Sequence, residues 1–145
     1  MRQARWVLGL VLLSGCSDSG PPVDIVVPKG FIGPVWIVLD LNGQDIPLVN
    51  GRYQVVIPAG GVLRVRSHRP FERWHPSSAQ YDDGAPLREE YGSNPAGPDV
   101  VALRGGGSAV TTRDGREIRW MPYFVGTAKQ YSERPAMDFP PGVGR

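Results

Sequence analysis

The chain has 145 residues, of which 16 are Lys or Arg and 14 are Asp or Glu, so its formal net charge is +2 at pH 7. This length suits one domain. The apolar residues come in short alternating runs with Gly and Pro between them, which excludes a wholly disordered chain. Because Cys16 is the only cysteine, the sequence also excludes a disulfide within the chain.

The first fifteen residues predict an export signal. Arg2 and Arg5 give a basic start, the mostly apolar stretch Trp6–Leu13 follows, and small residues precede Cys16. The apolar stretch is too short to span a bilayer, which takes roughly 20 residues. We therefore expect residues 1–15 to be removed on export.

The end of this signal, Leu13-Ser14-Gly15-Cys16, resembles the lipobox of bacterial lipoproteins. The resemblance implies cleavage before Cys16, a diacylglycerol thioether on its sulfur, and acylation of the new amine by a fatty acid such as palmitate. Polar residues 17–22 then predict a tether, and two or more acyl chains anchor a protein stably. The alternative is a short apolar helix with a buried cysteine, which leaves the polar tether unexplained.

Removal of the signal changes the charge balance. Arg2 and Arg5 leave with it, so the 16 basic residues become 14, equal to the 14 acidic residues. A nucleic-acid partner loses its main electrostatic support, and we expect none.

Short β-type runs separated by turn signals fill residues 23–131, the predicted folded domain. In the first half we expect strands at 35–41, 53–57 and 62–66. The turns between them are predicted at Asn42-Gly43, Asn50-Gly51 and Pro58-Ala59-Gly60-Gly61.

The second half predicts further short strands. We expect them at 100–103, 108–112, 116–120 and 123–125, with a hairpin turn at Arg113-Asp114-Gly115. No window of eleven or more residues has a helical stripe, and residues 89–91 predict one helical turn at most. Seven or eight short strands indicate an all-β fold, either a small sandwich or a partly open barrel.

Two segments predict irregular structure. Residues 67–99 contain several prolines and no clear strand pattern, so we expect a long loop there, and long loops are often functional. Residues 132–145 combine proline with charge and predict a loose tail.

Two family resemblances support the β prediction. Residues 33–65 resemble a transthyretin-like or carboxypeptidase-regulatory-like sandwich repeat. Pro28–Val35, Ile57–Gly61 and Phe124–Thr127 resemble segments of a family of small bacterial secreted and lipoprotein domains of unknown function. The second resemblance covers residues 24–131 and implies an envelope domain, with no activity or site to carry over.

His68 and His75, with the neighbouring carboxylates of Asp82 and Asp83, are the candidate ligands for a metal site. These residues lack recognised ligand spacing, and nearby arginines would repel a divalent cation. The alternative is two loop histidines, one of them stacked on Trp74. We expect no metal and no cofactor.

Serines and paired acids are the candidate catalytic residues. Ser77, Ser78 and Ser108 are not in a nucleophile-elbow context, and the acids of 82–90 lie among Gly and Arg as solvated loop acids do. We expect no enzyme activity, with a hydrolase as the third-ranked function.

The best binding candidates are arginines interleaved with aromatic residues, a composition enriched at protein interfaces. On the strand at 62–66, Leu63 and Val65 are expected to face inward and the arginines outward. The alternative is an ordinary solvent face neutralised by nearby acids. The candidate binding residues are Arg64, Arg66, Arg69, Phe71, Arg73 and Trp74.

Together these patterns predict a lipid-anchored β domain of the cell envelope that binds a partner or has a structural role. The membrane is reached through Cys16, and an envelope protein or anionic glycan is the candidate partner. The alternative is a periplasmic inhibitor or immunity protein that blocks an envelope-targeting enzyme through residues 67–99. Ser17 favours the outer membrane, facing the periplasm, over the inner membrane, although Asp18 reduces the strength of this inference.

Overall fold

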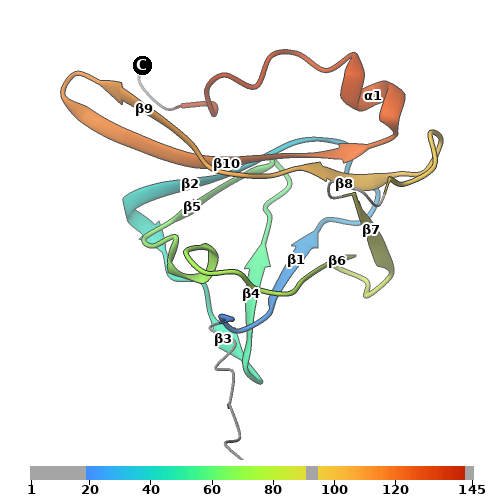
Figure 1. Cartoon of the computed structure of the whole chain (residues 1–145), viewed down its shortest axis with the longest axis horizontal. Helices are drawn as coiled ribbons and strands as arrows, with labels where there is room; N and C mark the ends of the chain where they lie inside the picture. Colours follow the sequence, from blue (N-terminus) through green and yellow to red (C-terminus); the bar gives the residue numbers. More distant parts are fainter. Residues whose placement is uncertain (1–18, 91–94, 143–145) are drawn as a thin grey trace, which may run out of the picture.

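The computed structural model describes residues 19–90 and 95–142, so the predicted signal and Cys16 lie outside the described residues. The described chain forms one mixed β-sheet that curls into a half-barrel (Figure 1). Two short helical segments accompany the sheet, η1 (Arg69–Phe71) and α1 (Ala128–Ser132). The prediction of an all-β fold is confirmed.

Within the described residues the sheet has ten strands, against the seven or eight expected. Their order is β3-β4-β1-β6-β7-β8-β10-β2-β5, and β9 pairs separately with the first half of β10. The strands are β1 (Val23–Val27), β2 (Gly33–Gln44), β3 (Leu48–Val49), β4 (Arg52–Val56), β5 (Val62–Val65), β6 (Ser77–Tyr81), β7 (Pro86–Glu90), β8 (Ala102–Gly105), β9 (Ala109–Arg113) and β10 (Arg116–Gly126).

The strand β1 lies between β4 and β6 and runs parallel to both. Its first residue, Val23, is in register with Tyr53 of β4 and with Ser77 of β6. The amino-terminal ends of these three strands therefore meet at one end of the sheet, away from α1 (Figure 1). The segments that precede them are brought together there.

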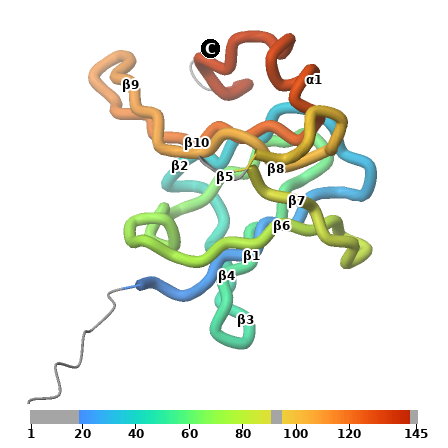
Figure 2. Tube along the Cα trace, turned by 45° about the vertical axis from the view of Figure 1, so that its right-hand side comes forward, coloured from blue at the N-terminus to red at the C-terminus, as the bar shows by residue number. Residues whose placement is uncertain are grey.

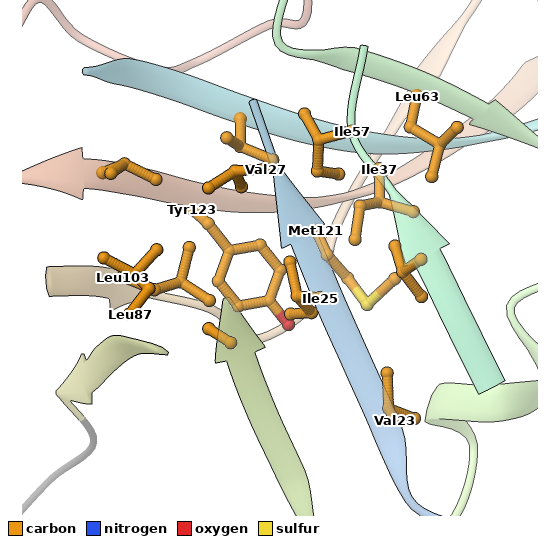
Figure 3. Packing of buried hydrophobic residues seen from close by; sticks show 14 of the residues in the cluster. Val23, Ile25, Val27, Ile37, Ile57, Leu63, Leu87, Leu103, Met121 and Tyr123 are labelled. Atoms are coloured by element: carbon orange, nitrogen blue, oxygen red, sulfur yellow. The ribbon is translucent and has the colours of Figure 1, made fainter. Parts of the chain in front are cut away.

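One hydrophobic core fills the inside of the half-barrel (Figure 3). Val23, Ile25 and Val27 alternate along β1 toward this core, and Met121 and Tyr123 reach it from β10. Each Val or Ile side chain fully removed from water contributes about 1.5–3 kcal/mol. This core explains how the domain can fold without a disulfide.

A second apolar cluster, built from Trp36, Val38 and Trp120, lies on the outer face of β2 and β10. The chain after α1 turns back over β10 and covers this cluster (Figure 2). Met137 packs against it, and the ring centroids of Phe139 and Trp120 are 5.9 Å apart. Met137 and Phe139 therefore attach the described part of the C-terminal segment to the sheet, although most residues of 132–142 are exposed.

Three of the four predicted turns are confirmed, and one is wrong. At Pro58-Ala59-Gly60-Gly61 the Gly61 N–H donates to the Pro58 carbonyl at 2.8 Å. Asn50-Gly51 and Asp114-Gly115 have positive φ angles, as a type I′ hairpin turn requires. Asn42-Gly43 instead lies inside β2, which continues to Gln44 with a register shift against β5. Gly43 is needed there for another reason, because a Cβ on it would lie 2.6 Å from backbone atoms of Val65.

The predicted long loop at 67–99 is wrong in part, because it contains η1 and the paired strands β6 and β7. Each of these strands has a single buried hydrophobic residue, Ala79 or Leu87, so neither shows an alternating pattern. Glu89 and Glu90 belong to β7, so the described part of 89–91 forms no helical turn.

Three smaller differences concern strands. The strand expected at 100–103 is β8, which begins two residues later, and the runs at 116–120 and 123–125 form one strand, β10. Pro122 lies within β10 without ending it. The central strand β1 had not been expected at all.

Candidate functional site

The candidate site lies where β1, β4 and β6 begin. The segments before these strands are the end of the predicted tether, the β3–β4 hairpin and residues 69–76. Backbone hydrogen bonds join them: the Gly20 N–H donates to the Trp74 carbonyl at 2.9 Å, and the Tyr53 N–H donates to the Pro22 carbonyl at 2.8 Å. The segment carrying Arg69, Arg73 and Trp74 is therefore fixed beside the point where the tether enters the fold.

Residues 69–76 are held by their inward side chains. Pro70 is buried at the start of η1, and the Ser67 hydroxyl accepts a hydrogen bond from the Arg69 N–H at 3.0 Å. Phe71 packs against the main core. With Phe71 and Pro70 turned inward, the Trp74 side chain stands 75% exposed.

Both histidines of this region contact Phe71. Its ring centroid lies 6.4 Å from that of His68 and 5.6 Å from that of His75, edge-on in each case. The expectation that one histidine stacks on Trp74 is therefore not met. Burial lowers the pKa of His68, which favours the neutral ring.

The other residues of the metal hypothesis lie at the opposite end of β6. The Asp83 carboxylate pairs with the Lys29 ammonium group at 3.0 Å, and the Lys29 backbone N–H donates to Asp82 at 2.9 Å. In the part of the chain that the structure describes, no three His, Cys, Asp or Glu side chains are grouped as metal ligands would be.

The structure does not bring all six predicted binding residues together. Arg64 pairs with Asp40 at 3.1 Å, and Arg66 is 3.4 Å from Asp45. Arg69 and Arg73 line a hollow of about 570 Å³ beside the tether. The other residues of this hollow are Ser19, Gly20, Pro21, Tyr53, Pro70 and Glu72.

Trp74 borders a second hollow of about 450 Å³, whose far side is the glycine run at 105–107. Ser77 lies in it and donates a hydrogen bond to Glu89 at 2.7 Å, while His75 Nδ1 lies 2.8 Å from the Arg73 carbonyl oxygen. Burial raises the pKa of Tyr123 to about 12, so its phenol stays neutral. The second hollow therefore combines polar groups with an exposed indole ring. Such a combination is suited to binding a ligand or partner.

Two residues of this end were missed in the sequence. Leu48 and Val49 of β3 are 55% and 41% exposed. The signal was available, because two adjacent apolar residues beside a tight turn cannot both face inward from one strand. We define the tether-end surface as Leu48, Val49, Arg69, Arg73 and Trp74.

Comparison with known proteins shows a similarity of fold. No family model and no curated protein matches the chain, so both family resemblances stay predictions. The fold is similar to the crystal structure of a putative lipoprotein from Bacillus anthracis, with 11% identity and a TM-score of 0.50. The match covers 83% of this chain and 81% of that one. At this identity the similarity concerns the fold alone.

The helices of the described residues are short. Across 19–90 and 95–142, none has the length and apolar composition needed to cross a membrane.

Proposed function

We propose that this chain is a bacterial envelope lipoprotein whose folded β domain is anchored by acyl groups on Cys16 and binds a partner or has a structural role at the membrane. Leu13-Ser14-Gly15-Cys16 supplies the acyl acceptor, and polar residues 17–22 supply the tether. The fold similarity to a Bacillus anthracis protein that carries the name of lipoprotein supports the same class.

The observation that carries the proposal is the short distance in sequence between Cys16 and the folded domain. Gly20 is already fixed by its hydrogen bond to Trp74, and Val23 begins the central strand. Four residues span at most roughly 14 Å, even when fully extended. An anchor on Cys16 therefore keeps the domain at the membrane surface.

The outer membrane is the proposed location, with the domain in the periplasm. Ser17 follows the acylated cysteine, where an aspartate would often retain a lipoprotein in the inner membrane. Ser17→Asp should therefore move the protein toward the inner-membrane fraction without detaching it. A distribution unchanged by Ser17→Asp would contradict this sorting.

The anchor itself is tested by Cys16→Ala, which removes the acyl acceptor. We expect this variant to lose metabolic labelling by fatty acid and to leave the lipoprotein pool of the membrane fraction. Ser19→Ala, three residues away, is the matched control and should behave as the native protein does. If Cys16→Ala incorporates fatty acid and partitions as the native protein does, the proposal is wrong.

A further inference from the structure

Three exposed apolar side chains, Leu48, Val49 and Trp74, lie on segments at the tether end of the domain, while other exposed apolar residues such as Leu41 and Val110 lie elsewhere. Trp74 is 75% exposed, whereas Trp36 and Trp120 are 8% and 4% exposed. Leu48 and Val49 are also exposed, and they lie on the hairpin that leads into β4. A tryptophan left in water forgoes the free energy that burial of its large apolar ring would contribute.

The sheet topology places these side chains on the side of the membrane anchor. Because β1, β4 and β6 are parallel and in register, the segments that precede them share one end. The Gly20–Trp74 and Pro22–Tyr53 hydrogen bonds fix the tether against two of these segments. An anchored domain must therefore present this end, or a surface close to it, to the bilayer.

Charge distinguishes the two ends of the same strands. At the tether end, exposed Arg69 begins η1 and exposed Arg73 follows it, with Glu72 as the acid between them in sequence. The opposite end of β6 carries Asp82 and Asp83. Lys29 offsets part of the charge of Asp82 and Asp83 at the far end. The end nearest the anchor, with two exposed arginines against Glu72, is the one better suited to anionic headgroups.

We propose that the tether-end surface is a membrane-docking face for an anionic phospholipid bilayer; this inference rests on the proposed lipid anchor. Trp74 lies at the headgroup level, where indole rings are favoured because one edge is apolar and the other polar. Leu48 and Val49 reach the same interface, and Arg69 and Arg73 approach lipid phosphates. The anchor makes the docking intramolecular, so weak contacts are enough to orient the domain.

The proposal has a geometric consequence. Docking by this end directs the C-terminal segment and its apolar cluster away from the membrane, since α1 and that segment lie across the fold from the start of β1 (Figures 1 and 2). The far ends of β1, β4 and β6 then face the compartment.

The test measures contact between Trp74 and lipid directly. The acylated protein is reconstituted in vesicles of phosphatidylethanolamine and phosphatidylglycerol, with or without bromine on the acyl carbons nearest the headgroup. Subtracting the emission of Trp74→Phe isolates the Trp74 signal from the two buried tryptophans. We expect brominated lipid to quench this signal and the vesicles to shift it to shorter wavelength.

Charge variants provide the matched comparison. Arg69→Ala with Arg73→Ala should lower the docked-to-undocked ratio by about fivefold for each arginine removed. Arg113→Ala with Arg116→Ala removes the same charge from the exposed β9–β10 hairpin and should leave quenching unchanged. Phosphatidylcholine vesicles should give weaker quenching than the anionic vesicles.

Two outcomes separate this inference from the anchor. If the protein is acylated and brominated lipid does not quench Trp74, docking is overturned and the anchor stands. If the chain carries no acyl group, the anchor is overturned, and the same brominated vesicles added in excess still test docking. The docking proposal would also be overturned if the hairpin control lost as much quenching as the Arg69 and Arg73 variant.

Discussion

The Asp24 side chain joins the three parallel strands. Its carboxylate accepts hydrogen bonds from Arg52 of β4, at 2.5 and 2.7 Å, and from the Ser78 hydroxyl of β6 at 2.5 Å. The hydrogen bond from Arg52, with that from Ser78, lowers the pKa of Asp24 below its ordinary value of 3.8. A carboxylate between two neighbouring strands thus stabilises the sheet next to the tether-end surface.

We predict that Asp24→Asn lowers the free energy of unfolding by about 1–2 kcal/mol at neutral pH, since it removes charge-assisted hydrogen bonds. The folded pKa of Asp24 lies below the unfolded value, so its contribution is present above 3.8 and is lost as pH falls through the folded pKa. Urea unfolding at neutral and acidic pH should show the native and variant curves converging in acid. Asp99→Asn is the exposed control, and a difference independent of pH would contradict this account.

Arg104 is a buried charge, 2% exposed, that ties β8 to its surroundings. It pairs with Glu90 and donates to the carbonyl oxygens of Val100 and Gly126, both at 2.9 Å. Such a pair is costly to break, because the remaining partner is left without its counter-charge.

Arg104→Met should therefore cost about 3–5 kcal/mol, the range for removing one partner of a buried ion pair. Thermal unfolding measures the loss, and Arg116→Met on the exposed hairpin is the control, expected within about 0.5 kcal/mol of native. Equal effects of the two variants would show that the buried pair contributes no more than a surface arginine.

At the scale of elements, tight turns were predictable from the sequence where the turn residues themselves decide the backbone geometry. Asn50-Gly51 and Asp114-Gly115 form the expected hairpins because their own backbone preferences decide the geometry. Asn42-Gly43 carries the same signal, yet there a distant strand decides: Val65 of β5 approaches the Gly43 backbone across the register shift. A contact between residues so far apart in sequence leaves no local pattern.

Gly43 and Gly60 allow a matched test of the packing of β2 on β5. Gly43→Ala places a Cβ 2.6 Å from Val65 backbone atoms and should destabilise the domain by about 1–3 kcal/mol, the usual cost of overpacking. Gly60→Ala has no atom within 4 Å of the added Cβ and should change stability by less than about 0.5 kcal/mol. Equal stability of the two variants in urea would contradict the assigned packing of β2 on β5.

The C-terminal segment is an element whose packing depends on the sheet beneath it. Met137→Ala should cost about 1–2 kcal/mol, below the range for a fully buried methionine because the side chain is only partly buried. Tryptophan emission should also move to longer wavelength as Trp36 and Trp120 gain water. Val110→Ala, at an exposed position of β9, should change neither quantity. Unchanged emission and melting in Met137→Ala would mean that the segment does not protect the cluster.

At the scale of the whole molecule, the all-β class was predictable and the arrangement was not. Alternating runs such as 62–66 identify strands that face one core, and Leu63 and Val65 are buried as expected. The strands β6 and β7 have only one fully buried residue each, Ala79 and Leu87, so their place in the sheet comes from pairing with distant neighbours. Parallel pairing of β1 with β4 and β6 likewise has no signal in the local sequence.

The candidate site, too, was predictable only in part from the sequence. Arg69, Arg73 and Trp74 were identified by residue type and lie on one short segment, where the arginines line one hollow and Trp74 borders another. Arg64 and Arg66 were grouped with them by sequence proximity, although their side chains pair with Asp40 and Asp45. Closeness in sequence between β5 and residues 69–74 was therefore a poor guide to which side chains form one site.

The central claim is that Cys16 is the acylated first residue of an anchored domain. The most direct measurement is the intact mass of the protein extracted from membranes with detergent. We predict a polypeptide that begins at Cys16 with the added mass of a diacylglycerol group and an amide-linked acyl chain. A chain that retains Met1, or that begins elsewhere with an unmodified Cys16, would contradict the account.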